Sequence, residues 1–164
     1  MSNLVPVQAA VAGERIVPLA ATHEIHWRAL YRDYADFYSL PMSDDILART
    51  WAWLMDGQSR RLEGLVAQAP DGTVVGLVHF RAVPDPLLGR DVGFLDDLFV
   101  SPVTGEQTIT RRLIQAVADE GRRRSWPHVR WVTAPNNANA RMLYDTLARA
   151  TAWVTYELVT GVKP

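Results

Sequence analysis

The chain has 164 residues, 48% of them hydrophobic, and this length favours one compact domain over two. Its 17 basic and 18 acidic side chains nearly cancel, so no overall charge recruits nucleic acid or an anionic membrane. The chain contains no cysteine, which excludes disulfides, thiolate nucleophiles and cysteine-based metal sites, and a cytoplasmic location is expected.

Residues 1–13 are predicted to form a loose N-terminal arm, and residues 14–164 a single domain. The arm is apolar, but it lacks the basic residues that begin a signal peptide, and Pro6 interrupts it. No segment approaches the roughly 18 consecutive apolar residues that a membrane helix requires. We therefore expect no membrane partner.

Residues 14–20 predict a short edge strand, because Pro18 cannot donate a ladder hydrogen bond. A helix follows, whose apolar face recurs at helical spacing and consists of Trp27, Leu30, Tyr31, Tyr34, Phe37 and Tyr38. Ser43 is predicted to cap a second helix that ends near Gly57. Alternation in residues 62–68 and 73–80, on either side of a Pro-Asp-Gly turn, predicts a β-hairpin.

Two prolines and a glycine in residues 82–90 predict an ordered loop before a strand at residues 92–100. Apolar residues from Ile109 onward then predict a helix, and residues 129–133 a strand parallel to the preceding one. Asn136 or Asn137 is expected to cap a last helix, and residues 152–159 to form a final strand. The resulting order, β-αα-βββ-α-β-α-β, predicts a mixed α/β fold.

The connection after the strand at residues 92–100 has the features of an anion site. A helix N-terminus presents unpaired N–H groups and a partial positive charge, and Arg111 and Arg112 in its first turns can add charge-assisted bonds to a pyrophosphate. The alternative is an ordinary strand–loop–helix connection with solvated arginines.

Asp96 and Asp97 are expected to alternate in direction along their strand, so that only one of them faces a cleft. A partly desolvated carboxylate in that position has a raised pKa and can act as a base toward an ammonium group. The alternative is a carboxylate held by a neighbouring arginine or a backbone N–H.

Taken alone, Asn137 fits a helix cap and Tyr144 fits a core residue. Their joint spacing is more specific than either residue. The segment reads Asn137-x-x-Ala140-x-x-x-Tyr144 and follows the strand that ends near Thr133. We therefore expect the start of the helix and the tyrosine hydroxyl to lie beside the end of the sheet.

In this order, the motifs resemble those of the GCN5-related N-acetyltransferase (GNAT) superfamily. Residues 96–102, Asp-Asp-Leu-Phe-Val-Ser-Pro, resemble its central strand, and the segment from Asn137 to Tyr144 resembles its second motif. Residues 34–38 and the pattern formed by Leu143, Tyr144, Asp145, Ala148 and Tyr156 are similar to the subgroup that includes fungal histone and D-amino-acid acetyltransferases. The similarity covers the chain from about Arg15 onward.

The resemblance implies a splayed, mixed central sheet of six to seven strands flanked by about four helices. It also implies acetyl-CoA as the donor and direct attack by a primary amine of a small molecule or peptide. The residues implied in donor binding are Leu98, Phe99, Val100, Gly105, Glu106, Gln107, Thr108, Ile109, Thr110, Arg111 and Asn137.

The resemblance further implies that Tyr144 is the general acid that protonates the departing thiolate. Asp96 occupies the position of a family glutamate that binds or deprotonates the amine, either directly or through a water. Tyr31, Tyr34, Tyr38 and Asp97 are expected to line the acceptor site.

The chain departs from the family at the phosphate loop. Glu106, Thr108 and Thr110 stand where the family has glycines, and Gly105 stands where it has an arginine. This departure leaves a second function open, a GNAT-fold binding or assembly module with weak or no acetyl-CoA binding. The histidines form no ligand set, so no metal is expected, and pairing of two copies through the terminal strand is a further hypothesis.

Overall fold

The structure is a computed structural model that describes residues 13–102 and 105–161. The described chain divides between Val132 and Thr133 into two compact units. The first unit contains the sheet and three of the α-helices, and the second contains the remaining helix, α4, Ala138–Tyr144.

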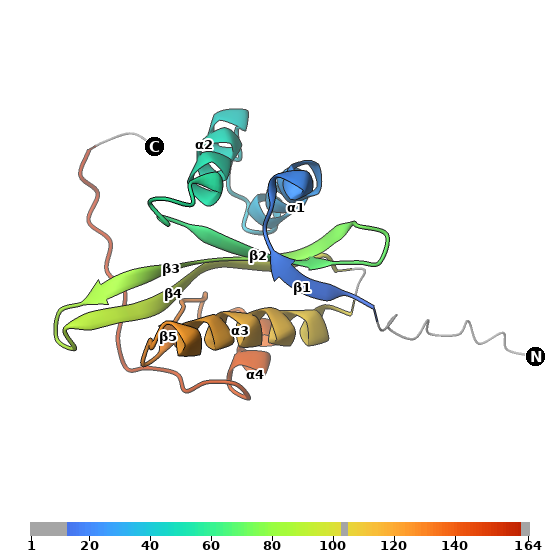
Figure 1. Ribbon diagram of the computed structural model, residues 1–164. Coiled ribbons are helices and arrows are strands. Elements are labelled where there is room, and N and C mark those ends of the chain that lie inside the picture. Colours follow the sequence, from blue (N-terminus) through green and yellow to red (C-terminus); the bar gives the residue numbers. More distant parts are fainter. Residues whose placement is uncertain (1–12, 103–104, 162–164) are drawn as a thin grey trace, which may run out of the picture. The chain divides into compact units, whose positions relative to one another are not determined.

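The first unit is built on one mixed sheet whose five described strands lie in sequence order (Figure 1). The strands are β1 (Arg15–Pro18), β2 (Glu63–Gln68), β3 (Val74–Asp85), β4 (Arg90–Val100) and β5 (Val129–Arg130). The first four pair antiparallel, and β5 pairs parallel to β4, as a crossover through a helix requires. The predicted α/β fold class is confirmed.

Helices cover both faces of this sheet (Figure 1). A short 3-10 turn, η1 (Ala21–His23), leads into α1 (Glu24–Phe37), which with α2 (Asp44–Met55) covers one face, whereas α3 (Glu106–Arg123) covers the other. Ser43 caps α2 as predicted, because its Oγ accepts a hydrogen bond of 3.2 Å from the Ile46 N–H. No described helix is long and apolar enough to cross a membrane.

Each face of the sheet has its own apolar core. On the α1 side, the buried cluster consists of Trp27, Leu30, Leu47, Val66, Val74 and Leu77. On the α3 side, the amphipathic helix buries Ile109, Leu113, Ile114 and Val117. The sheet is therefore clamped between two apolar layers, which fixes the direction in which each residue of β4 points.

The predicted loop at residues 82–90 is wrong for its first half. β3 continues to Asp85, β4 begins at Arg90, and Pro84 pairs with Asp91 within the ladder. The pairing of β3 with β2 ends at Phe80, so the outer edge of β3 carries no ladder at Pro84. A proline can therefore occupy the strand there without losing a ladder hydrogen bond.

The prediction of six to seven strands is also wrong, because the described residues form five. Residues 152–159 have no regular secondary structure, and Trp153 and Tyr156 are 84% and 91% exposed. Alternating hydrophobicity shows that a segment suits a strand, but a strand also requires partner N–H and C=O groups, which alternation does not supply. β5 likewise ends at Arg130 rather than at Thr133.

Candidate functional site

A β-bulge in β4 decides where the two adjacent carboxylates point. Opposite β4, His79 pairs with Asp97 and Phe80 with Leu95, so Asp96 is the extra residue without a partner in β3. Asp97 contacts His79, and Asp96 contacts Arg81, two residues further along β3 and therefore on the same face. Both carboxylates thus lie on the α1 face, and the expectation that they alternate is wrong because the bulge interrupts the two-residue period.

Asp96 has a cationic partner. The Arg81 Nε–H donates to both carboxylate oxygens, at 3.1 and 3.0 Å. Burial raises the pKa of Asp96, and the opposing effect of Arg81 is too small to bring it back to its ordinary value. Asp96 is therefore a stronger base than an aspartate in water.

Asp97 has neutral partners. Its Oδ2 lies 2.8 Å from His79 Nδ1 and accepts a hydrogen bond of 3.0 Å from the Tyr31 hydroxyl. Burial acts to raise the pKa of Asp97, but the hydrogen bond and electrostatic interaction with His79, together with the hydrogen bonds from Tyr31 and Tyr34, outweigh it and hold the pKa below its usual range. Asp97 is therefore a fixed anion and a weak base.

Aromatic side chains of α1 lie beside these carboxylates. Tyr31 stacks on Tyr34 with ring centroids 5.8 Å apart, and Tyr34 packs edge-on against Tyr38 at 5.2 Å. Tyr34 also contacts Phe99 of β4 at 5.7 Å. Burial, together with the nearby Asp97 carboxylate, raises the pKa of the Tyr31 hydroxyl far above its usual range. The structure thus brings together all four residues predicted for the acceptor wall.

The sheet opens along one edge of β4. β5 pairs with β4 only at Gly93 and Phe94, whereas Leu98, Phe99 and Val100 pair with β3 alone among the described strands. The backbone groups of these three residues that face away from β3 therefore have no strand partner among the described residues. This opening is the splay that the sequence predicted.

Helix α3 begins at Glu106, inside the predicted phosphate loop at residues 105–110. Glu106, Gln107 and Thr108 form its first turn, so only Gly105 of the six predicted loop residues lies outside the helix. Gly105 precedes the helix with φ of 60°, a left-handed conformation that glycine adopts without strain. The glycine at this position is explained by the backbone it must adopt.

The other residues of the α3 start divide between core and surface. Ile109 is buried at 2% exposure, so its side chain belongs to the core. Glu106, Gln107 and Thr108 are exposed, and the Thr108 N–H already donates to the Gly105 carbonyl. Arg112 turns away and donates to the Glu14 carbonyl at 2.7 Å.

The second unit contains Asn137 and Tyr144. Asn137 caps α4 as predicted: its Oδ1 accepts from the Ala140 N–H at 3.4 Å and its Nδ2 donates to Thr133 Oγ1 at 3.3 Å. Tyr144 is the last residue of α4 and is partly exposed, next to the buried Leu143. Residues 137–144 thus form a short, capped helix with the tyrosine at its end.

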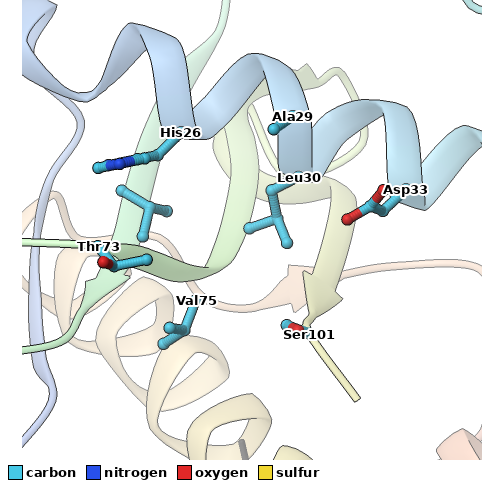
Figure 2. Close-up of a pocket in the computed structure, with 8 residues that line it drawn as sticks. His26, Ala29, Leu30, Asp33, Thr73, Val75 and Ser101 are labelled. Atoms are coloured by element: carbon cyan, nitrogen blue, oxygen red, sulfur yellow. The ribbon is translucent and has the colours of Figure 1, made fainter. Parts of the chain in front are cut away.

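A separate hollow of about 260 Å³ lies along another flank of α1 (Figure 2). Its lining consists of His26, Ala29, Leu30, Asp33, Thr73, Val74, Val75 and Ser101. Figure 2 shows His26 and Asp33 on α1 at either side of the apolar Leu30. None of the predicted site residues lines this hollow, so it is distinct from the carboxylate pair.

A protein-family model described as the acetyltransferase (GNAT) family matches residues 23–148, which is most of the chain and includes the bulged strand and the helix with Tyr144. The chain belongs to this family. As a GNAT protein it is an N-acetyltransferase, and its acyl donor is acetyl-CoA.

Individual relatives are distant but cover nearly the whole chain. The D-amino-acid N-acetyltransferase HPA3 of Saccharomyces cerevisiae is 26% identical over 159 residues, which cover 96% of this chain and 98% of the relative. The ribosomal-protein-alanine N-acetyltransferase of Brucella melitensis biovar Abortus 2308 has a TM-score of 0.76 and 27% identity, over 89% of this chain and 99% of that one. Aminoglycoside N-acetyltransferase AAC(6')-Iy, solved in complex with CoA, has the same fold, with a TM-score of 0.76 at 23% identity, over 96% and 99%.

Three residues that lie around the two carboxylates were missed from the sequence: Trp27, His79 and Arg81. Trp27 and His79 read as core residues, because one lies on the apolar face of a helix and the other between Val78 and Phe80 in a strand. The available signal was His79 itself, since a histidine inside an apolar strand must find hydrogen-bond partners when buried. Nothing local identifies those partners, which lie 52 and 18 residues away.

Proposed function

We propose that the chain transfers the acetyl group of acetyl-CoA to a primary amine of a small molecule by direct attack of the amine nitrogen. The observation that carries the proposal is the carboxylate pair, Asp96 and Asp97, which lies on one face of β4 with one pKa raised and the other lowered. Two neighbouring carboxylates with opposite pKa shifts suit the roles of base and anchor.

The donor side of the proposal uses backbone groups of β4 and α3. The open edge at Leu98, Phe99 and Val100 suits an extended amide-bearing arm, and the α3 N-terminus from Gly105 onward suits a pyrophosphate. The remaining proposed contacts along this end of the helix are Glu106, Gln107, Thr108, Ile109, Thr110 and Arg111. Asn137 is proposed to contact the carrier arm, with its side chain fixed by the cap hydrogen bonds.

Proton movements are assigned by pKa. An alkylammonium must lose a proton before its nitrogen can attack a carbonyl carbon, and Asp96, with its raised pKa, takes this proton directly or through one water. Asp97 stays ionised and holds the ammonium group in place. Tyr144 is proposed as the acid that protonates the departing thiolate, because a phenol of pKa about 10 can return a proton to a thiolate. Its support is the family motif.

The acceptor wall is proposed to consist of Tyr31, Tyr34 and Tyr38, whose rings form one contiguous surface beside Asp97. Arg81 adds a guanidinium that is 43% exposed and, among the described residues, donates hydrogen bonds only through Nε. A carboxylate on the acceptor can pair with its remaining N–H groups. This favours an amino acid over a polycationic aminoglycoside as the acceptor. A cytoplasmic location, supported by the cysteine-free composition, is part of the same proposal.

Donor binding is the first test. Calorimetric titration with acetyl-CoA should show saturable binding, and Glu106→Gly, which restores a family glycine and removes a negative charge, should bind more tightly. The absence of binding heat at high micromolar acetyl-CoA would instead support a non-catalytic binding module.

Acceptor choice is tested with a thiol-release assay. The panel contains D- and L-amino acids, their carboxamides, an aminoglycoside and a peptide with N-terminal alanine. Amino acids should react faster than their carboxamides, and Arg81→Gln should abolish this preference. Tyr144→Phe should lower kcat by at least about tenfold with little change in acetyl-CoA affinity. An unchanged kcat would remove Tyr144 as the acid.

A further inference from the structure

A buried histidine connects the core of the α1 face to the candidate acceptor site. His79 lies in the middle of β3 with 0% exposure. The Trp27 Nε1–H donates to its Nε2 at 2.9 Å, and its Nδ1 lies 2.8 Å from Asp97 Oδ2. An indole nitrogen can only donate, so Nε2 must carry a lone pair and the imidazole proton must lie on Nδ1. The geometry therefore fixes one neutral tautomer, which donates to Asp97.

The neutrality of this histidine leaves the charge of Asp97 uncompensated. Tyr31, which donates to the same carboxylate oxygen, is also neutral, and its ring packs edge-on against His79 with centroids 5.0 Å apart. No arginine among the described residues forms an ion pair with Asp97, whereas Asp96 has Arg81. Asp97 is 20% exposed, so this fixed negative charge remains open to a cation from solvent.

We propose that His79 and Trp27 are positioning residues, which hold Asp97 in a fixed, ionised state for the ammonium group of the acceptor. The inference rests on the proposed function, because it deepens the role assigned there to Asp97. Preorganised neutral dipoles orient a carboxylate without consuming its charge, whereas a histidine cation in the same place would neutralise it. Trp27 prevents that cation by occupying the nitrogen that would have to take the second proton.

The competing explanation is a buried polar cluster that contributes only to stability. Under that explanation, loss of His79 lowers the unfolding midpoint but leaves the affinity for the acceptor unchanged. Under the positioning explanation, loss of His79 acts through Asp97 and raises the acceptor KM. A double-mutant cycle separates the two, because residues that act through one another are non-additive.

The experiment measures steady-state kinetics with the best amine of the acceptor panel, at saturating acetyl-CoA, for His79→Leu, Asp97→Asn and the double variant. His79→Leu should raise the acceptor KM by about tenfold or more with little change in the acetyl-CoA KM. In the Asp97→Asn background the same substitution should have no further effect. His79→Asn, whose amide N–H can replace the Nδ1 donor, should retain an acceptor KM within about threefold of the wild type.

Trp27→Phe provides a second, milder test, because it keeps an aromatic ring in the core and removes only the indole N–H. The freed imidazole can then place its proton on Nε2, so this variant should also raise the acceptor KM. Long-range ¹H–¹⁵N spectra of the wild type should show the His79 imidazole proton on Nδ1.

The outcomes distinguish the two levels of the proposal. A wild-type chain that binds acetyl-CoA but acetylates no amine in the panel would refute the proposed function. An active wild type in which His79→Leu leaves the acceptor KM unchanged, or changes it equally with and without Asp97, would refute the positioning role. A proton on Nε2 of His79 in the wild type would refute it as well.

Discussion

Gly93 is the position where the packing of the sheet makes its sharpest prediction. A Cβ added at Gly93 would lie 2.6 Å from Trp126 Cε3 and 2.8 Å from Val129 Cγ2. Ordinary contacts between such atoms are about 3.5 to 4 Å, so Gly93→Ala must displace Trp126 or β5 by about 1 Å. Trp126 is 8% exposed and packs against Phe80 and the Arg124 guanidinium, so it has little room to move.

Overpacking of this kind costs about 1 to 3 kcal/mol, from which about 0.4 to 1 kcal/mol is recovered because alanine restricts the unfolded chain. We therefore expect Gly93→Ala to lower the free energy of unfolding by about 1 to 2 kcal/mol. With a urea m-value of about 1 to 3 kcal/mol per molar, the unfolding midpoint should fall by roughly 0.3 to 2 M.

The matched control is Gly57→Ala, because a Cβ at Gly57 has no neighbour within 4 Å. Its midpoint should equal or slightly exceed that of the wild type. The double variant Gly93→Ala, Trp126→Leu should lose less stability than the sum of the losses of the two single variants. The reason is that the shorter leucine side chain leaves space for the new methyl group. Equal midpoints for Gly93→Ala and Gly57→Ala would refute the packing argument.

Three further predictions concern individual side chains. Asp96→Asn should lower kcat by about 10²-fold or more. In the wild type, kcat/KM should decrease as Asp96 becomes protonated, at a pH above the usual aspartate range, and Asp96→Asn should abolish this decrease. Glu63, whose pKa is lowered because hydrogen bonds from Arg124 and Arg60 outweigh burial, should stabilise the fold only when ionised. Glu63→Gln should therefore lower the free energy of unfolding by about 1 to 3 kcal/mol at pH 7. Urea unfolding should show this difference from the wild type decreasing as the pH falls below the ordinary glutamate pKa of about 4.3. Ser43→Ala should cost about 1 kcal/mol by thermal unfolding and Ser43→Asp almost nothing, because only aspartate can still accept from the Ile46 N–H.

The parts of the fold that the sequence predicted correctly depend on local interactions. The apolar period of α1 and α3, the capping serine before α2 and the capping asparagine before α4 each act within a few residues. The splay of the sheet was also predicted, from the family motif, and the shared helix face of Tyr31, Tyr34 and Tyr38 was predicted from helical spacing. Local chemistry is sufficient for such features because the competing conformations differ within one turn or strand.

The features that were missed depend on cross-strand register and long-range contact. Nothing in the letters Asp-Asp indicates that Asp96 is an extra residue, because a bulge exists only relative to the partner strand. The hydrogen bond from Trp27 to His79 joins residues 52 positions apart, so neither residue carries a local sign of it. The terminal segment at residues 152–159 has the alternation of a strand but no strand partner among the described residues.

The bulge at Asp96 therefore creates the candidate site, because it places both carboxylates on one face of the sheet. With regular pairing, Asp96 and Asp97 would point to opposite faces, and one carboxylate would be directed into the apolar layer under α3. The extra residue turns both toward α1 and gives them different partners, Arg81 for Asp96 and the neutral His79 and Tyr31 for Asp97. Although Asp96 pairs with Arg81, its pKa is raised, because one arginine that is 43% exposed compensates less for burial than His79 and the tyrosine hydrogen bonds do at Asp97. The different partners of the two carboxylates thus separate the proposed base from the proposed anchor.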